Sequence, residues 1–156
     1  MTHYMKAKIA AFIILTTLAL PTQAQDAASQ NKAYTGAQAS DKTYKVIYQL
    51  DSGSPDVINK AIRNIGNLLN DPRLSGKLEV ELVAFSGGTE AFRKASEYEQ
   101  GIKGLLERGV RIVQCLNTLK ERKIEKSELY DFLAYTPSGN GELVIRAEEG
   151  WTIIKP

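Results

Sequence analysis

The sequence predicts an α/β protein built on a mainly parallel sheet. Two observations lead to this prediction. The apolar pattern of the chain switches repeatedly between the two-residue period of strands and the roughly 3.6-residue period of helices. The spacing between successive strands leaves room for a helix, as the βαβ crossover of a parallel sheet requires. The composition agrees, because 43% hydrophobic and 24% charged residues in a chain of 156 are typical of one soluble domain with an appendage.

The first residues are typical of a secretory signal peptide. Two lysines precede an uncharged apolar run over residues 9–20, and Thr22 and Ala24 are small residues at the positions that signal peptidase reads. The run is shorter than the roughly 20 apolar residues that span a bilayer. We therefore expect residues 1–24 to be removed by cleavage after Ala24. The mature protein would then be exported to the periplasm, with no membrane insertion after signal cleavage.

Removal of residues 1–24 changes what the charges imply. The full chain has 20 Lys and Arg, 18 Asp and Glu, and 1 His; loss of Lys6, Lys8 and His3 leaves 18 basic and 18 acidic residues and no histidine. A formally neutral protein gives no electrostatic reason to expect nucleic acid as a partner. The missing imidazole excludes Ser-His-Asp triads, Cys-His dyads and His-ligated metal sites from the mature chain. We expect neither a metal nor a cofactor.

A polar leader is expected before the folded domain. Residues 25–43 are rich in Ala, Gln, Ser and Asp and show neither a helical nor an alternating apolar pattern, which predicts a flexible segment. The folded domain then covers residues 44–156. Its first strand is the β-rich run over residues 44–50, which ends in turn residues.

Helices and strands alternate after this first strand. Ser54 as N-cap and Pro55 at the first helical position open a helix whose apolar stripe runs to about Asn70. Residues 77–85 alternate and then become wholly apolar, as in a strand whose second half is covered on both faces. A helical stretch, continuous or broken, then leads to Gly109. The remaining expected elements are a strand over residues 109–115, helical turns over 117–123 and 127–130, a strand over 132–135, a helix entered from the turn at 137–141, and a strand over 151–154.

Small and polar residues follow four of the expected strands. The carboxyl ends of parallel strands meet at one edge of the sheet, where open α/β sheets bind their ligands. Backbone N–H groups and helix starts at this edge would favour an anion. Glycines also serve tight turns alone, and no nucleotide-binding glycine motif is present. The candidate ligand-binding residues are Asp51, Ser52, Gly53, Ser86, Gly87, Gly88, Asn117, Thr118, Ser138 and Gly139.

Cys115 is the single cysteine of the sequence and lies where a strand passes into a helix. Without a second cysteine, no intramolecular disulfide can form. A cysteine beside a helix start can have its pKa lowered from about 8.5 into the range of about 3.5–7.5, and its thiolate is then nucleophilic without a base. The alternative is a small buried hydrophobic residue, which composition alone favours. Cys115 is the candidate catalytic residue of the first interpretation.

Between residues 44 and 156 the sequence resembles the DsrE/DsrF-like (YchN-like) family. The most specific pair of motifs is Gly-Val-x-x-x-x-Cys-x-Asn-Thr-Leu followed, near the end, by Gly-Trp-x-Ile-Ile-x-Pro. The segments that carry the resemblance are residues 45–50, 61–69, 79–85, 109–119, 137–139 and 149–156.

The resemblance implies a flavodoxin-like three-layer sandwich of about five mainly parallel strands with helices on both faces. It also implies a homo-oligomer, a trimer or a hexamer. In sulfur-relay members of this family, a cysteine at the position of Cys115 accepts sulfur as a persulfide and passes it to a partner protein. Such transfer needs an accessible, acidified thiol at the rim of the sheet.

Three functions stay open at this point. The first is a periplasmic thiol or persulfide sulfur carrier, sulfurtransferase-like if it is an enzyme, that works with a sulfur donor or acceptor protein. The second is a module that binds a small ligand without turning it over. The third is an oligomeric structural protein whose cysteine is buried for packing.

Overall fold

The computed structural model describes residues 26–40 and 43–156. The expected signal peptide over residues 1–24 lies outside these ranges. Helix α1 (Ala27–Ala33) lies in a unit separate from the compact unit Gln38–Pro156. The Asp26 side chain caps α1 by accepting from the backbone N–H of Ala28 at 3.2 Å. This helix was not expected from the apolar pattern, because α1 buries none of its residues and relies on its cap and on alanine's helical propensity.

Strands and helices alternate through the compact unit, as the periodicity predicts. Three short 3₁₀ helices, η1 to η3, fill the longer connections. The elements are β1 (Tyr44–Leu50), α2 (Pro55–Leu69), η1 (Pro72–Leu74), β2 (Leu78–Ala84), η2 (Ser86–Phe92), α3 (Glu99–Glu107), β3 (Arg111–Cys115), α4 (Leu116–Arg122), η3 (Lys126–Glu128), β4 (Ala134–Thr136), α5 (Gly139–Glu148) and β5 (Thr152–Ile154).

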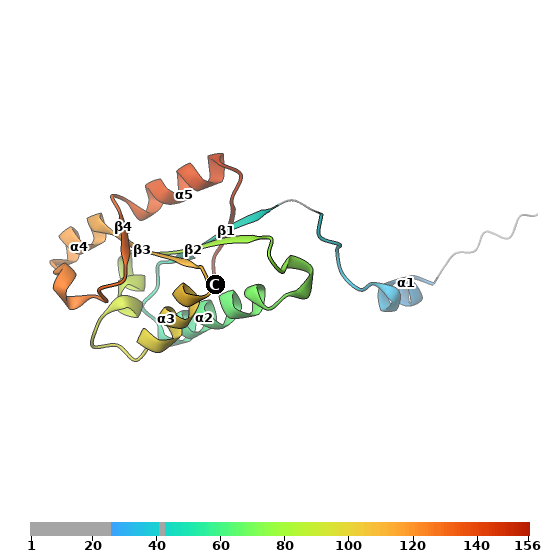
Figure 1. Cartoon of the computed structure of the whole chain (residues 1–156), viewed down its shortest axis with the longest axis horizontal. Coiled ribbons are helices and arrows are strands. Elements are labelled where there is room, and N and C mark those ends of the chain that lie inside the picture. Colours follow the sequence, from blue (N-terminus) through green and yellow to red (C-terminus); the bar gives the residue numbers. More distant parts are fainter. Residues whose placement is uncertain (1–25, 41–42) are drawn as a thin grey trace, which may run out of the picture. The chain divides into compact units, whose positions relative to one another are not determined.

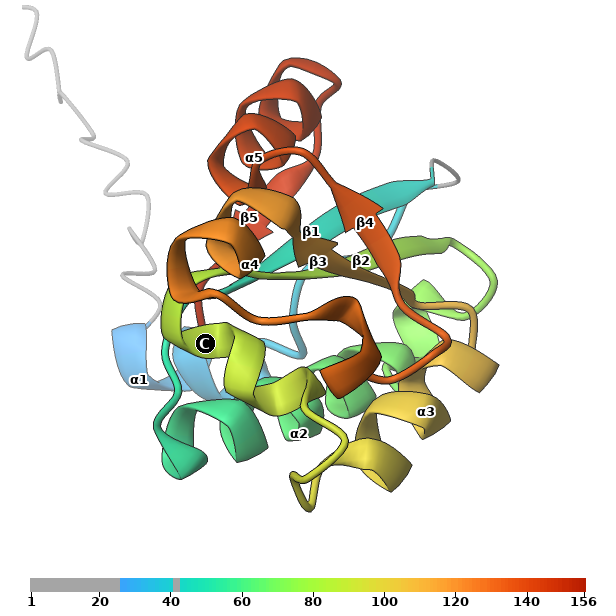
Figure 2. The same ribbon diagram turned by 90° about the vertical axis from the view of Figure 1, so that its left-hand side faces the viewer.

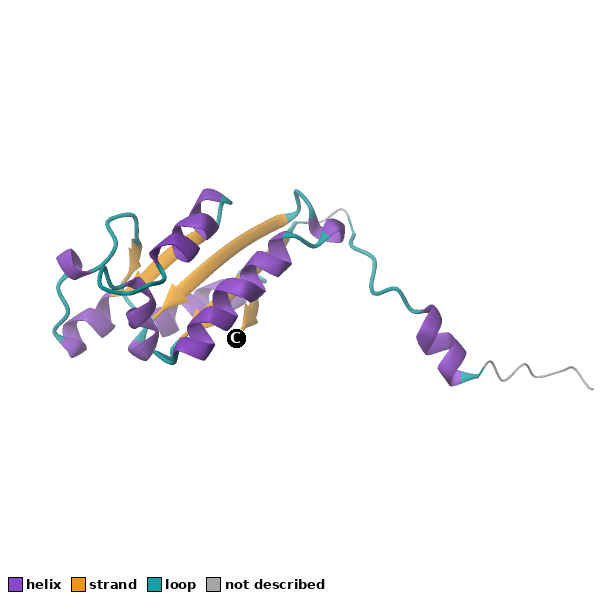
Figure 3. Ribbon diagram, turned by 90° about the horizontal axis from the view of Figure 1, so that it is seen from below, coloured by secondary structure: helices purple, strands orange, loops and turns teal. Residues whose placement is uncertain are grey.

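The five strands form one sheet in the order β4-β3-β2-β1-β5, and every neighbouring pair is parallel. Helices α2 and α3 cover one face and α5 covers the other (Figures 1 and 2). Figure 3 shows the helices of the first face lying over the strands when the molecule is seen from below. The predicted three-layer α/β class is therefore confirmed. Its strand order differs from the 2-1-3-4-5 order of flavodoxin itself.

Each face of the sheet has its own core. The larger core, on the side of α2 and α3, contains alternate residues of the strands such as Tyr48 and Leu82. The smaller core lies under α5 and contains Ile47, Val83 and Val113 from the strands, with Leu143 of α5 and Trp151. The two cores differ in size because α5 is the one described helix that lies on the second face.

Apolar burial anchors α5 only weakly. Gly139 and Leu143 are its buried residues, and Val144 and Ile145 remain 64% and 57% exposed. Burial of one leucine side chain contributes about 2 kcal/mol. Polar contacts must therefore supply much of what holds α5 against the sheet.

The chain changes faces between β3 and β4, which are neighbours in the sheet. Helix α4, after β3, adds Leu119 to the larger core, whereas α5, after β4, covers the opposite face. A change of this kind opens the crevice in which α/β sheets bind ligands. Cys115 and Thr136, which end these two strands, are register partners at this point.

No helix within residues 26–40 and 43–156 combines the length and the apolar character needed to cross a membrane.

Candidate functional site

Cys115 is both the last residue of β3 and the N-cap of α4. Its Sγ accepts a hydrogen bond from the backbone N–H of Thr118 at 3.5 Å. A cap of this kind is usually a hydroxyl or carboxylate oxygen. A sulfur in the same place receives the unpaired N–H groups of the first helical turn, as the sequence predicts.

Further donors surround the sulfur. The hydroxyl of Thr118 and the backbone N–H groups of Asn117 and Gly139 also lie near the thiol and help to lower its pKa. Gly139 is the first residue of α5, so the starts of two helices, α4 and α5, lie against one sulfur atom. The N–H of Asn117 also donates to the carbonyl of Pro137 at 3.2 Å, which ties the start of α4 to the loop before α5.

Ser86, directly after β2, orients the Thr118 hydroxyl. Its backbone N–H donates to Thr118 Oγ1 at 2.9 Å, so the hydroxyl proton of Thr118 is left to donate to sulfur. Ser86 has φ 49°, a left-handed conformation that costs a non-glycine residue energy. On its other side, the Ser86 carbonyl accepts from Arg122 of α4 at 2.9 Å. The strained residue is therefore held by α4 at both of its backbone polar groups.

These contacts act on the acidity of the thiol. Burial raises the pKa of Cys115, but the hydrogen bonds from Thr118, Gly139 and Asn117 stabilise the thiolate and outweigh burial, so the pKa lies below its ordinary value. The donors that make the thiol more acidic are thus Thr118, Asn117 and Gly139, and the start of α4 supplies most of them.

The sulfur is covered. The Cys115 side chain is only 3% exposed, whereas the resemblance required a thiol presented at the rim of the sheet. Gly139, the first residue of α5, packs so tightly on Phe85 that a Cβ there would lie 2.5 Å from the ring carbon Cδ1. Cys115 therefore lies at the predicted edge but is not open to solvent.

The other predicted ligand-binding residues divide into two groups. Asn117, Thr118, Ser86 and Gly139 lie around Cys115, and Ser138 caps the start of α5 by accepting from the N–H of Gly141 at 3.2 Å. The second group lies at the end of β1 and of β2, and consists of Asp51, Ser52, Gly53, Gly87 and Gly88.

Packing explains most of the second group. A Cβ on Gly88 would collide with the Leu50 carbonyl, and one on Gly87 would lie 2.7 Å from the backbone nitrogen of Gly53. The Asp51 carboxylate accepts from Lys155 Nζ at 2.8 Å and from Gln49 Nε2 at 3.1 Å. The Lys155 contact is the main reason why the pKa of Asp51 is lowered, and burial opposes it. These residues mainly hold together the loop after β1, the loop after β2 and the C-terminal segment.

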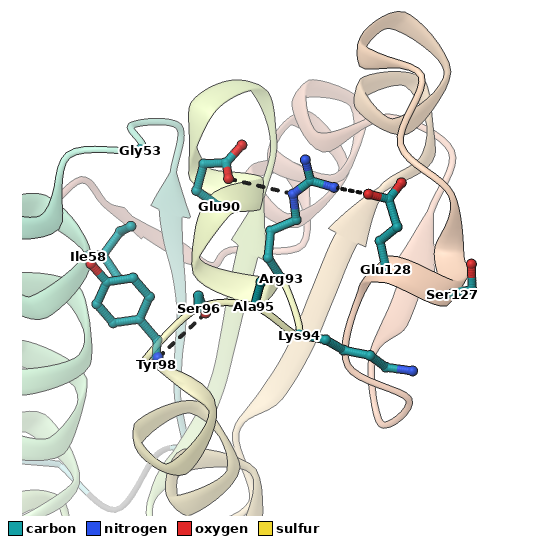
Figure 4. A pocket seen from close by; sticks show the side chains of 10 residues that line it. All are labelled: Gly53, Ile58, Glu90, Arg93, Lys94, Ala95, Ser96, Tyr98, Ser127 and Glu128. Carbon is teal, nitrogen blue, oxygen red and sulfur yellow. Dashed lines mark hydrogen bonds and ion pairs between the residues drawn. The ribbon is translucent and has the colours of Figure 1, made fainter.

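A separate groove of about 740 Å³ lies on the side of α2 and α3 (Figure 4). Of the predicted ligand-binding residues, only Gly53 lines it, and Cys115 does not. Arg93 lies between Glu128, at 2.6 Å, and Glu90, at 3.6 Å, so its charge is already balanced. The full lining is Gly53, Ile58, Glu90, Arg93, Lys94, Ala95, Ser96, Tyr98, Ser127 and Glu128.

The sequence did not reveal a buried ion-pair network beneath α5. The Glu81 side chain of β2 is fully buried, and its Oε2 accepts from Arg111 of β3 at 2.9 Å and from Arg146 of α5 at 2.8 Å. Residue 81 alternates with Val80 and Leu82 and therefore reads as solvent-facing. Arg146, 65 positions later on a predicted helix, is the one feature that could have indicated a buried partner for Glu81. Nothing in the sequence, however, determines which strand that helix crosses.

Within residues 26–40 and 43–156, no three His, Cys, Asp or Glu side chains are grouped so that they could hold a metal ion.

Comparisons with known proteins agree with the predicted resemblance. The sequence profile of the DsrE/DsrF-like family matches residues 10–156. The solved structure of MTH1491, a protein of unknown function from Methanobacterium thermoautotrophicum, is 32% identical; the match covers 72% of this chain and 99% of that one, with a TM-score of 0.68. BT1422 from Bacteroides thetaiotaomicron, also of unknown function, is 13% identical and shares the fold, with 72% and 94% coverage and a TM-score of 0.59. No curated protein matches the chain.

Proposed function

Since the chain belongs to the DsrE/DsrF-like family, we propose that it is a sulfur-relay protein and that Cys115 carries the sulfur. Family membership supports a role of this type. The observation that supports Cys115 as the carrier is the set of hydrogen bonds that lower its pKa. A structural cysteine has no need of four donors from two helix starts.

The reaction needs only a thiolate and a sulfane sulfur. The Cys115 thiolate attacks the outer sulfur of a donor persulfide, a new S–S bond forms to Cys115, and the donor leaves as its own thiolate. Cys115 then carries a persulfide, and an acceptor thiolate takes the outer sulfur in the reverse sense. No electron is gained or lost overall, so neither step needs a metal, a redox cofactor or a histidine.

The donors around the sulfur suit both states of the carrier. The N–H groups of Thr118 and Gly139 and the Thr118 hydroxyl point at an atom that is negative before attack. After transfer the negative charge moves one atom outward, to the terminal sulfur. The residues around the sulfur must then shift to admit a second sulfur, because the side chain is only 3% exposed in the structure described.

The wider setting is part of the same proposal. The protein acts in the periplasm after cleavage behind Ala24, exchanges sulfur with a donor or acceptor protein, and works as a homo-oligomer, a trimer or a hexamer. The exposed apolar side chains Val144, Ile145 and Ile153 on and beside α5 offer a surface for contact between copies.

Sulfur uptake is tested by intact mass. Incubation of the reduced protein with polysulfide should add the mass of about one sulfur atom, and reductant should remove it. Cys115→Ser should gain no mass under the same conditions. If the native protein acquires no sulfur while its unfolded form does, Cys115 is a packing residue and the proposal is wrong.

The groove favours a second candidate function, binding of a small ligand. Its volume of about 740 Å³ is in the range of ligand pockets, and its paired charges and its serines suit a neutral, hydrogen-bonding molecule with an apolar part. Because Cys115 is not in the lining, Cys115→Ser should leave affinity for such a ligand unchanged. A screen of neutral fragments, followed by backbone NMR shifts at Ser96 and Ser127, tests this function. Shifts confined to the Cys115 loops would contradict it.

A further inference from the structure

Arg146 joins α5 to the sheet through one end of its guanidinium group, while the rest of the group contacts residues of α5 and of the turn after it. Its Nη2 donates to the buried Glu81 at 2.8 Å, and its Nε lies 3.0 Å from Glu142. Its Nη1 donates to Glu149 at 3.0 Å, and the group lies 4.5 Å from the ring centre of Trp151. A guanidinium can make these planar contacts together, which an ammonium cannot. We refer to the contact between Arg146 and Glu81 as the α5 pin.

A second chain of contacts leads from the pin to the sulfur. Glu142, which binds Arg146, also accepts a hydrogen bond from Thr136 Oγ1 at 2.9 Å. Thr136 ends β4 and is the register partner of Cys115. Directly before α5, the Pro137 carbonyl accepts from the N–H of Asn117 at 3.2 Å, and the N–H of Gly139 is one of the groups that stabilise the thiolate. The pin is thus connected, through Glu142 and Thr136, to the end of α5 that lies beside Cys115.

Because α5 buries little apolar surface, its position depends strongly on the pin. Leu143 is the large side chain that α5 buries, whereas Val144 and Ile145 face outward. The Arg146 side chain is 19% exposed and Glu81 is fully buried, so their attraction is poorly screened by water. Loss of the pin should loosen α5 before it loosens the larger core on the other face.

We propose that the Glu81–Arg146 pair is a positioning device for Cys115: it holds the start of α5 over the sulfur, where α5 both donates a hydrogen bond to the thiolate and shields it from reagents. Release of the pair withdraws the donor and the cover together. The thiol then becomes less acidic and, once ionised, more reactive. Its role in sulfur transfer rests on the proposed function, but the positioning itself does not.

Other charged groups near these elements are tied into pairs of their own. Arg122 of α4 binds Glu90 of η2 at 2.7 Å as well as the Ser86 carbonyl. Glu142 of α5 binds Arg146 and Thr136. The influences on the Cys115 pKa are burial and hydrogen-bond donors, so the loss of one donor is the effect to be measured.

The test compares pin variants with a matched control. The double variant Glu81→Gln/Arg146→Gln removes both charges, so neither residue of the pin is left as a buried ion without its partner. Arg146→Lys keeps the charge but cannot contact Glu81, Glu142 and Trp151 together, and it serves as the second variant should the double one fail to fold. Arg111→Gln is the control, because Arg111 binds the same Glu81 oxygen from β3 without touching α5.

Two quantities are measured for each protein. The pH midpoint of thiolate formation comes from ultraviolet absorbance relative to the same protein carrying Cys115→Ser. The rate of alkylation by iodoacetamide is taken on the plateau above this midpoint, where the thiol is fully ionised. A rise of one unit in pKa alone increases this rate about threefold through nucleophilicity, so a larger increase reports access.

In the pin variants, the midpoint should rise by about one pH unit, a tenfold loss of thiolate below it, and the plateau rate should rise by about tenfold. Arg111→Gln should change neither quantity. A folded pin variant in which either quantity stays at the wild-type value overturns the proposal, as does an equal change in the control. Polysulfide uptake by the wild type is scored separately, so failure of the pin and failure of sulfur transfer are told apart.

Discussion

Thr118→Val tests whether the Thr118 hydroxyl makes Cys115 acidic. Valine has nearly the shape of threonine, so the change removes the hydroxyl without leaving a large void. Two hydrogen bonds are lost: the one that Thr118 Oγ1 accepts from Ser86 at 2.9 Å, and the one that the hydroxyl gives to the thiol. Thr118 is 5% exposed, so water cannot readily replace either contact.

The size of the effect follows from the charge that the hydroxyl stabilises. A hydrogen bond to a charged group contributes about 1.5–3 kcal/mol, and one pKa unit corresponds to about 1.36 kcal/mol. The pKa of Cys115 should therefore rise by about one to two units. The unpaired N–H of Ser86 should in addition lower the free energy of unfolding by about 1–3 kcal/mol.

Thiolate absorbance as a function of pH measures the first effect, and denaturant unfolding measures the second. Thr118→Ser, which keeps a hydroxyl, is the control and should stay close to wild type in both. A Thr118→Val protein that is less stable but has an unchanged thiol pKa would show that the hydroxyl only supports Ser86. The account of the acidified thiol would then be wrong.

Three further predictions concern stability. Gly88→Ala should prevent folding or greatly lower the midpoint of thermal unfolding, because its Cβ would collide with the backbone carbonyl of Leu50. Gly104→Ala, in open space on α3, should instead increase the free energy of unfolding by at most about 1 kcal/mol. Leu143→Ala should cost about 2–5 kcal/mol in denaturant unfolding and should raise hydrogen exchange in α5 more than in α2. The pKa of the Cys115 thiol in the folded protein lies below the ordinary value, so ionisation of the thiol stabilises the fold. The free energy of unfolding of the wild type relative to Cys115→Ser should therefore increase as pH rises through the folded pKa, level off above about 8.5, and decrease again on acidification. A difference between the two proteins that does not change with pH would contradict this prediction.

The sequence predicts those features of the fold that depend on local pattern. Every expected strand is present, α2 begins behind Ser54 with Pro55 as predicted, and Cys115 ends a strand and caps a helix. Asn117 and Thr118 could be named as neighbours of the thiol because helix caps join residues two or three positions apart.

Features that depend on long-range placement could not be predicted. Gly139 reaches the sulfur because β4 lies beside β3, and Glu81 is buried because α5 crosses back over β2. Neither position follows from apolar periodicity, which says that a residue faces one side of a strand but not what covers that side. The burial of Cys115 could not be predicted for the same reason.

Both edges of the sheet are three-residue strands, β4 and β5. Such short edges offer an incoming strand few free backbone groups, which discourages growth of the sheet from one molecule into the next. In the proposed homo-oligomer, copies should therefore meet through side chains on their helices rather than through shared backbone ladders.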